Sequence, residues 1–379
     1  MLKNKIYKYL FSEILKNFIT ILLTFTAIAW VVRAVNFLDL IVDDGHSLGI
    51  YFKYTLLNIT TIMTRFVPLA FLLSLTISVI KFENKQEFLI LWTSGLSKIK
   101  IANFFILISF LITLFQLIFS IFVNPYLLNM SRSLMSNTES LQISSVLRAR
   151  EFNDNFRGIT FYIDSKNTNG ELLNIFIKDV GGNLETIIDE YGKKKSTTII
   201  AERGYITQNK LILFNGMIQT LNNEGQIKNF QFKKNELSLS RISSRSIKQT
   251  KLQETSTVLL FKCFFNQKNS LNLSNCGTTR DKTEVAQNIS RRLGTPLYIT
   301  LITIIVSILL VSQKEKKYNF LTKYILFTLS FIVLIIAEIL LKYTGFSLLV
   351  FIFYYALPVM TSVLFYAYLL KTISSEKVS

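Results

Sequence analysis

The chain has 379 residues, of which 50% are apolar and 17% are charged, with 32 Phe against 4 Pro and 14 Gly. This composition excludes an intrinsically disordered chain and a fibrous repeat protein. The formal net charge of +18 would suit a nucleic-acid-binding protein if the apolar residues were scattered along the chain. They are gathered in long runs instead, which indicates a membrane protein and argues against a nucleic-acid partner.

Six apolar stretches reach or approach the roughly 20 residues that a helix needs to cross a bilayer. They lie at about 17–38, 55–80, 101–123, 295–312, 323–341 and 347–370. Between the third and the fourth lie about 170 residues of ordinary polarity, which is enough for one folded domain. The sequence therefore predicts three membrane helices, one soluble domain and three more membrane helices.

The first stretch has some features of a cleaved secretory signal. Lys3, Lys5 and Lys8 precede an apolar run that contains Ala27-Ile28-Ala29, a small-x-small sequence. The run continues to Leu38, well beyond the apolar region of a signal, and further spans follow. A retained membrane helix is the better interpretation.

The Lys residues of the connections alternate in number, which predicts the orientation because cytoplasmic loops retain positive charge. The rich side comprises the N-terminus (Lys3, Lys5, Lys8, Lys16), the second connection (Lys81, Lys85, Lys98, Lys100), the fourth (Lys314, Lys316, Lys317, Lys323) and the tail (Lys371, Lys377). The other connections carry one each, Lys53 and Lys342. Both termini are therefore expected in the cytoplasm and the central domain outside it.

The central domain has the pattern of short β-strands. Eight segments alternate or are rich in β-formers: 159–163, 172–178, 197–201, 204–207, 210–214, 217–221, 227–232 and 236–239. Turn pairs such as Asn169-Gly170 and Asn215-Gly216 separate them. A sandwich or jelly-roll is the expected class. The pattern leaves open whether the domain is structural or holds acyl chains in a hydrophobic groove.

The chain lacks the residues that several kinds of chemistry require. The single histidine, His46, excludes a His-based metal cluster or catalytic triad from this chain alone, and no phosphate-binding loop is present. We therefore expect no enzyme activity, no metal and no cofactor. Cys263 and Cys276 lie in the stretch predicted to be outside, where a disulfide is permitted, and a bridge and two free thiols both remain open.

Three ionisable residues fall within the predicted spans, where each costs roughly 2.5–3.5 kcal/mol on insertion scales. Arg65 lies about nine residues into the second span, while Arg33 and Glu338 lie toward the outer ends of the first and fifth. In one interpretation Arg33 and Glu338 reach the interface and Arg65 pairs with a carboxylate such as Glu338. In the other, all three line an outward-open cavity with a basic wall, suited to a substrate with acyl chains and phosphates.

The second connection predicts a short amphipathic helix. Phe88, Leu91 and Trp92 lie at helical spacing after an acidic start, and Gly95 ends the helix. Such a helix between two spans suits the socket of a soluble partner. The alternative is a helix that lies on the membrane surface.

Four segments are similar to a known family, the lipopolysaccharide-export permeases LptF and LptG. The segment from Glu87 to Lys98, EFLILWTSGLSK, resembles the family's coupling helix, in which a Glu precedes a helix that ends in Gly-[Leu/Ile]-Ser. The segment 8–16 resembles its opening amphipathic helix, and Val67-Pro68-Leu69 and the segment 288–293 are also similar. With the three-plus-three spans around a β-domain, the resemblance covers essentially the whole chain.

The resemblance implies a membrane α-helical fold of six transmembrane helices with an inserted all-β periplasmic jelly-roll-like domain. It implies the following partners: an LptB-like cytoplasmic ATPase dimer, an LptG-like second permease subunit, an LptC/LptA-like periplasmic bridge and lipopolysaccharide in the bacterial inner membrane. It also gives Glu87 contact with the ATPase and Arg33 contact with the lipid, whereas Arg65 and Trp92 match no family pattern. Segments 32–34 and 42–45 are more similar to LptF than to LptG.

The sequence thus predicts a non-enzymatic permease subunit of an ABC-type transporter. Its expected parts are helices 1–3 in residues 1–124 with a coupling helix at about 84–95, the β-domain with its connections in 125–292, and helices 4–6 in 293–379. The expected coupling residues are Glu87, Phe88, Leu91, Trp92, Gly95 and Leu96, and the expected substrate-binding residues are Arg33, Arg65 and Glu338. The rival hypotheses are an anchored structural or sensory envelope protein and an ion-coupled transporter.

Overall fold

The computed structural model describes residues 2–38, 41, 47–146, 149–156, 158–167, 170–180, 194–207, 210–222, 226–238, 251–265, 279–311 and 316–376. The chain forms two compact units. The first comprises Met1–Val32, Asn58–Asn129 and Lys251–Ser379, and the second comprises Arg33–Leu57 and Met130–Thr250. Segment 42–45, which is more similar to LptF than to LptG, lies outside the described residues. Cys276 also lies outside them, whereas Cys263 is described and is disulfide-bonded.

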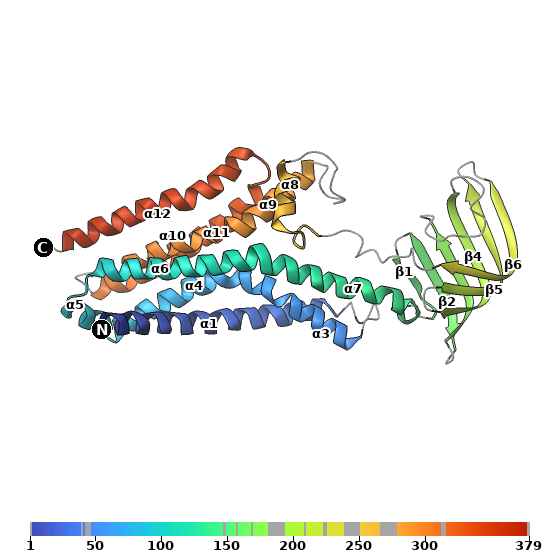
Figure 1. Ribbon diagram of the computed structural model, residues 1–379, viewed down its shortest axis with the longest axis horizontal. Coiled ribbons are helices and arrows are strands. Elements are labelled where there is room, and N and C mark those ends of the chain that lie inside the picture. Colours follow the sequence, from blue (N-terminus) through green and yellow to red (C-terminus); the bar gives the residue numbers. More distant parts are fainter. Residues whose placement is uncertain are drawn as a thin grey trace. The chain divides into compact units, whose positions relative to one another are not determined.

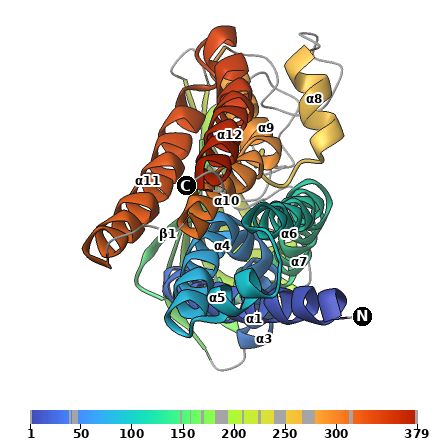
Figure 2. The same ribbon diagram turned by 90° about the vertical axis from the view of Figure 1, so that its left-hand side faces the viewer.

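Most of the chain outside the sheet is helical. The helices before the sheet are α1 (Leu2–Asn36), α3 (Leu48–Leu57), α4 (Ile59–Asn84), α5 (Glu87–Thr93), α6 (Lys98–Ile118), the π-helix η1 (Phe119–Val123) and α7 (Asn124–Val146). Those after it are α8 (Thr257–Phe265), α9 (Thr279–Leu293), α10 (Leu297–Ser307), the 3-10 helix η2 (Ile308–Leu310), α11 (Lys316–Tyr343) and α12 (Leu348–Glu376). The start of α1 and the end of α12 lie at the end of the bundle that carries α5 (Figures 1 and 2).

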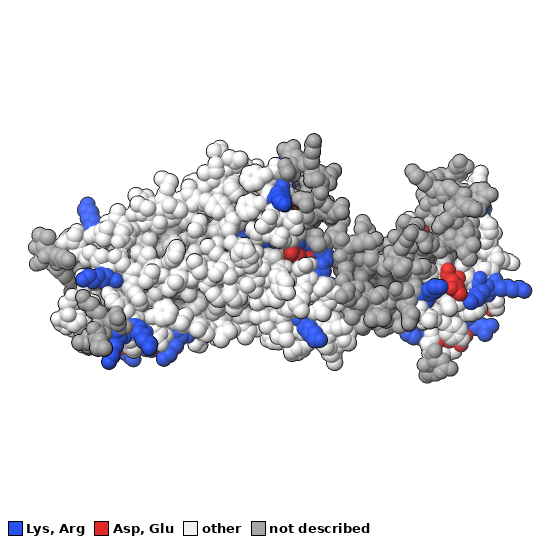
Figure 3. Space-filling view, viewed as in Figure 1, with Lys and Arg blue, Asp and Glu red and all other residues white. Residues whose placement is uncertain are grey.

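The helices confirm the predicted spans. Five are continuous: Lys5–Asn36, Leu48–Asn84, Lys98–Met135, Leu321–Tyr343 and Leu348–Ser374. The remaining span is a pair, Lys282–Leu293 and Leu297–Leu310, that bends by 47° around Pro296, because a proline cannot donate the backbone bond that a continuous helix needs. The continuous spans extend beyond the predicted apolar stretches, since their polar flanks remain helical. In Figure 3 the helical surface shows a broad band without charged side chains, and Lys and Arg gather at the α5 end.

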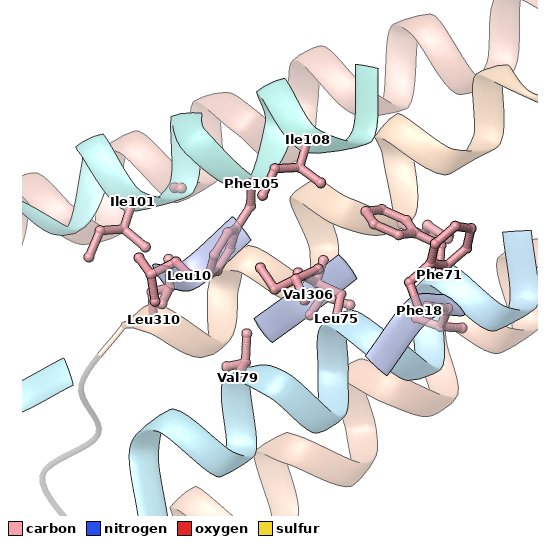
Figure 4. Close-up of a cluster of buried hydrophobic side chains, with 14 of the residues drawn as sticks. Leu10, Phe18, Phe71, Leu75, Val79, Ile101, Phe105, Ile108, Val306 and Leu310 are labelled. Carbon is pink, nitrogen blue, oxygen red and sulfur yellow. The ribbon is translucent and has the colours of Figure 1, made fainter. Parts of the chain in front are cut away.

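The core of the first unit lies where α1, α4, α6 and α10 meet (Figure 4). On α1, Leu10, Ile14 and Phe18 recur every fourth residue, so they face α4 and α6 together. Ser74 donates a hydrogen bond of 2.9 Å to the carbonyl of Ile14, which requires the two helices to approach closely. In a bilayer, small residues and interhelical hydrogen bonds stabilise such contacts, because lipid is as apolar as the side chains.

The second unit contains an antiparallel sheet in which each strand pairs with its neighbours in sequence. The strands are β1 (Phe152–Phe156), β2 (Ile159–Lys166), β3 (Glu171–Asp179), β4 (Lys194–Thr207), β5 (Lys210–Asn222) and β6 (Ile227–Ser238). An all-β domain inserted between two helical halves is therefore confirmed. Among the described residues its strands form one six-stranded meander instead of the two sheets of a sandwich, so the jelly-roll topology remains a prediction.

The eight predicted segments become five strands, β2 to β6, because the alternation changes phase in mid-strand, whereas β1 was not predicted. On β5, Leu211 and Leu213 are buried before Asn215, and Ile218 is buried after it, so the buried positions shift from odd to even. Glu202 on β4 lies beside Asn215 and accepts a hydrogen bond of 3.3 Å from its side-chain amide. The segments at 197–201 and 204–207, and at 210–214 and 217–221, are therefore single strands, β4 and β5. The segments at 227–232 and 236–239 likewise fall in one strand, β6, as far as Ser238.

Asn215 makes this phase change possible and carries a prediction. Its φ is +50°, in the left-handed region that Asn and Gly tolerate and that β-branched residues almost never adopt. We expect Asn215→Val to destabilise the second unit by about 1–3 kcal/mol, and Asn215→Gly to be tolerated. The temperature at which a protease begins to cleave this unit in the full chain in detergent measures the effect. Equal cleavage temperatures for the two variants would contradict the role of the left-handed residue.

Candidate functional site

The helix α5 lies at the end of the bundle and is anchored by two buried side chains. Phe88 and Leu91 are 6% and 9% exposed, and the ring of Phe88 lies 5.6 Å from that of Phe82 at the end of α4. Trp92 stacks on Phe88 at 5.7 Å, and the Lys98 ammonium lies 5.9 Å from the centre of the indole. These contacts make α5 a rigid continuation of the membrane core.

The opposite face of α5 is apolar and exposed. Leu89 and Ile90 are 57% and 64% exposed. The predicted coupling residues thus divide into two groups: Phe88, Leu91 and Leu96 are buried, whereas Glu87 and Trp92 are half-buried and Gly95 is exposed with φ +84°. Helical spacing located the anchors and passed over Leu89 and Ile90, although residues one and two places after an anchor point to the other side of a helix.

Glu87 begins α5, where its negative charge complements the partial positive charge of the helix N-terminus. One of its carboxylate oxygens accepts a hydrogen bond of 3.3 Å from the Tyr9 hydroxyl of α1. The end of α4 just before α5 has its own links. Lys81 pairs with Glu13 of α1, and Lys323 of α11 lies 2.9 Å from the carboxylate of Glu83. The loop that carries α5 is thus connected by polar contacts to both α1 and α11.

A polar cavity of about 270 Å³ lies among α4, α6, η1, α9 and α11 of the first unit. Arg65, Arg291 and Glu338 line it, and one guanidinium nitrogen of Arg291 lies 4.0 Å from the Glu338 carboxylate. Arg65 and Glu338 also line a more apolar cavity of about 350 Å³ with Pro68 and Tyr298. The structure therefore brings two of the predicted substrate residues together. It adds Arg291, which the sequence showed only within a family-like motif.

Arg33 belongs to the other compact unit of the chain. It occupies the last turn of α1, is half-buried and belongs to the second unit. A cation in the last turn of a helix is favoured by the partial negative charge at that end.

Arg292, the neighbour of Arg291, is buried and joins two helices through hydrogen bonds. It is 6% exposed, and its guanidinium donates hydrogen bonds of 2.8–3.2 Å to the Thr257 hydroxyl and to the carbonyls of Thr255, Leu252 and Gln253. It thereby fixes the start of α8 to α9. Both arginines line the polar cavity, but only Arg292 is held by these four packing contacts.

No group of three or more His, Cys, Asp or Glu with metal-binding geometry is present in the described ranges. What those ranges contain is a set of spans, an apolar helix face at one end of the bundle and a charged cavity between the spans. These features define a multi-pass membrane protein with a charged cavity between its spans.

A comparison with known proteins identifies the family to which this chain belongs. The family model described as lipopolysaccharide export system permease LptF/LptG matches residues 8–372, nearly the whole chain, so the chain belongs to this family. An uncharacterized protein of Rickettsia prowazekii (strain Madrid E), RP871, is 24% identical over 176 residues, which are 45% of this chain. The match spans about half (48%) of the length of that protein. Membership of this family and the apolar spans make the chain a multi-pass protein of the inner membrane.

Proposed function

We propose that the chain is the permease subunit that grips lipopolysaccharide in the inner membrane and passes it to a periplasmic bridge, driven by a separate ATPase. The observation that carries the proposal is the exposed pair Leu89 and Ile90 on a helix anchored in the core. An apolar pair on a rigid support suits a groove on a soluble partner. A second, LptG-like permease completes the transporter, with this chain as the LptF-like subunit.

The orientation is part of the proposal. Lys and Arg gather at the α5 end of the bundle, which the positive-inside rule assigns to the cytoplasm together with both termini. The central β-domain is then periplasmic, and an LptC/LptA-like bridge receives the lipid from it. An LptB-like ATPase dimer binds at the α5 end.

The substrate contacts follow from charge and depth. The phosphates of lipopolysaccharide favour guanidinium groups, which bind them through two parallel hydrogen bonds. Arg65 and Arg291 supply such groups in the cavity, while Arg33 supplies one at the end of α1. Glu338 lies 4.0 Å from Arg291, and a bound phosphate would compete with this carboxylate for the guanidinium.

Motion of α5 reaches the substrate helices through the polar contacts of Glu87 on α5 and of Glu83 at the end of α4. The Tyr9 hydroxyl connects Glu87 to α1, the helix of Arg33. Lys323 connects Glu83 to α11, the helix of Glu338. ATP binding by the partner would displace α5 and, with it, both helices that carry substrate residues.

The first prediction from this proposal concerns the exposed face of α5. We expect Ile90→Asp to weaken capture of the ATPase more than about tenfold, because a charge in the centre of an apolar contact removes a hot spot. Co-purification of the ATPase from native membranes measures it. Leu48→Asp, at a leucine that is 73% exposed on α3, is the control and should retain the ATPase. Parental capture by Ile90→Asp would favour the rival anchored envelope protein.

The second prediction separates two roles of Glu87. If the carboxylate bonds to the ATPase, Glu87→Ala should weaken ATPase binding about tenfold, the effect of losing a charged hydrogen bond. Tyr9→Phe removes only the bond within the chain and should leave binding unchanged. Titration of the purified permease pair with ATPase measures both affinities. Equal losses in the two variants would show that Glu87 acts through Tyr9 alone.

The third prediction concerns the substrate. We expect Arg33→Glu to reduce lipopolysaccharide-stimulated ATP turnover of the assembled complex about tenfold, because the new carboxylate repels the phosphates. The matched control is Lys53→Glu, at an exposed residue of α3, which should keep the stimulation. Turnover is measured with and without lipopolysaccharide in nanodiscs. Unchanged stimulation in Arg33→Glu would remove Arg33 from the substrate contacts.

A further inference from the structure

Two buried amides of the third span hydrogen-bond to one residue of α4. The Gln116 amide nitrogen donates to the Thr64 carbonyl at 3.1 Å, and the Asn124 amide nitrogen donates to the Thr64 hydroxyl at 2.9 Å. Both amide residues are buried, at 3% and 8% exposure. They stand on either side of η1, so they hold the third span against α4 at its irregular turn.

These hydrogen bonds fix which way each amide is turned. A carbonyl can only accept, so the Gln116 nitrogen has to face Thr64 and the Gln116 oxygen has to face elsewhere. The Thr64 hydroxyl donates its single proton to the Thr61 carbonyl at 3.1 Å. It therefore accepts from Asn124, and the Asn124 oxygen is also directed away from Thr64. Neither amide can be turned around without losing its hydrogen bond.

The amide oxygens have no donor in the part of the chain that the structure describes. Gln116 Oε1 and Asn124 Oδ1 are buried without a hydrogen-bond partner, and so is the hydroxyl oxygen of Thr61. All three residues line the polar cavity of about 270 Å³. A buried polar atom without a partner is destabilising, and lipid tails cannot supply the missing donor. A ligand that satisfies this cavity therefore brings N–H or O–H groups.

The same cavity also requires negative charge. Arg65 and Arg291 line it, together with Glu338, whose carboxylate lies 4.0 Å from a guanidinium nitrogen of Arg291. Arg292 lines it as well, although its guanidinium already donates to the residues at the start of α8. The guanidiniums outnumber the carboxylate, so they repel a lone cation and attract a ligand that carries a phosphate.

A more apolar cavity of about 350 Å³ shares part of its wall with the polar one. Arg65, Thr295 and Glu338 line both. The other residues of the apolar cavity come from α4, α10 and α11 and include Phe66, Leu69, Phe331, Leu334 and Ile335. Small-ligand sites typically measure roughly 300–1,000 Å³, so the two cavities suit one head group and part of one hydrocarbon chain.

We propose that the two cavities form one site for a lipid that carries a phosphoethanolamine group. Its ammonium donates to the oxygens of Gln116, Asn124 and Thr61, and a primary ammonium has as many N–H donors as there are unpaired oxygens. Its phosphate binds Arg65 and Arg291, and its hydrocarbon chain enters the apolar cavity. This zwitterion satisfies the acceptors and the guanidiniums together.

Two kinds of lipid can carry this group: phosphatidylethanolamine, and a lipopolysaccharide whose phosphates bear ethanolamine. The site itself stands on the geometry of the cavities. Only its occupation by lipopolysaccharide rests on the function proposed above.

The experiment compares two phospholipids that share the phosphate and the formal charge and differ in their donors. The full chain in detergent is titrated with phosphatidylethanolamine and with phosphatidylcholine of identical short acyl chains, and bound lipid is measured by native mass spectrometry. Methyl groups replace the N–H donors in phosphatidylcholine. We expect phosphatidylethanolamine to bind about tenfold more tightly, the effect of a hydrogen bond to a charged group. Equal affinities would overturn the proposal and show that water alone satisfies the oxygens.

Three variants separate hydrogen bonding from the size of the head group. Thr61→Val keeps the shape of the side chain and removes an unpaired hydroxyl, so it should fold and should reduce the preference about threefold. Thr60→Val is the matched control, because the Thr60 hydroxyl is also buried and unpaired among the described residues but does not line the polar cavity. It should keep the preference. Arg291→Gln should weaken both lipids equally through the phosphate.

An unchanged preference in Thr61→Val would show that the size of the head group selects the lipid, and would overturn the ammonium contacts. An equal loss in Thr60→Val would overturn them too, because that residue lies off the cavity wall. A selective loss in Thr61→Val supports the site.

A competition assay on the same chain assigns the source of the group. Lipopolysaccharide with and without ethanolamine on its phosphates is added to the chain loaded with phosphatidylethanolamine. Stronger displacement by the ethanolamine-bearing form supports lipopolysaccharide as the ligand, and equal displacement by both forms supports the phospholipid. None of these measurements needs the ATPase. If the chain captures no ATPase but keeps its lipid preference, the proposed function fails and the site remains; capture of the ATPase without the preference overturns the site alone.

Discussion

The hydrocarbon core of a bilayer offers no water, so a polar group within a span must find its hydrogen-bond partner inside the protein. This constraint explains where the spans of the first unit meet. Asn17 donates to the Ser78 hydroxyl at 2.8 Å, and Ser74 donates to the Ile14 carbonyl, which together fix α1 against α4. Polar contacts therefore determine the register, and the apolar side chains of Figure 4 fill the space between the helices.

The same core extends into α5 through Phe82 and Phe88, so the exposed face of α5 is presented by a rigid element. A seven-residue helix is too short to be stable by itself, and its two buried anchors supply the stability that its length cannot. Rigid support matters for transmission of force, because a loosely attached helix would move without displacing α1 or α11. The polar contacts of Glu87 and Glu83 can transmit force only if α5 is held rigidly in this way.

The parts of the fold that the sequence predicted are those that depend on one local property. Apolar length predicted the spans, and helical spacing predicted α5. Long-range pairings gave no such signal: Glu338 and Arg291 meet only because α9 and α11 pack together. Alternation located β2 to β6 and missed β1, and its change of phase at Asn215 resembled a turn, since φ above zero is common to both. The π turn precedes Pro125, which offers no N–H to the carbonyl four residues earlier, so this proline marked an irregular turn that apolar length alone did not reveal.

The charged cavity and the π turn are joined at one helical step of α4. The Gln116 amide donates to the Thr64 carbonyl at 3.1 Å, and the Asn124 amide donates to the Thr64 hydroxyl at 2.9 Å. Arg65 is the next residue, on the wall of both cavities. The Thr64 carbonyl belongs to the peptide bond that leads to Arg65, so a movement of Gln116 acts on the backbone beside the Arg65 guanidinium. The phosphate proposed to bind Arg65 and the position of the third span would therefore influence each other, and this influence is reciprocal because coupling of binding free energies has no preferred direction.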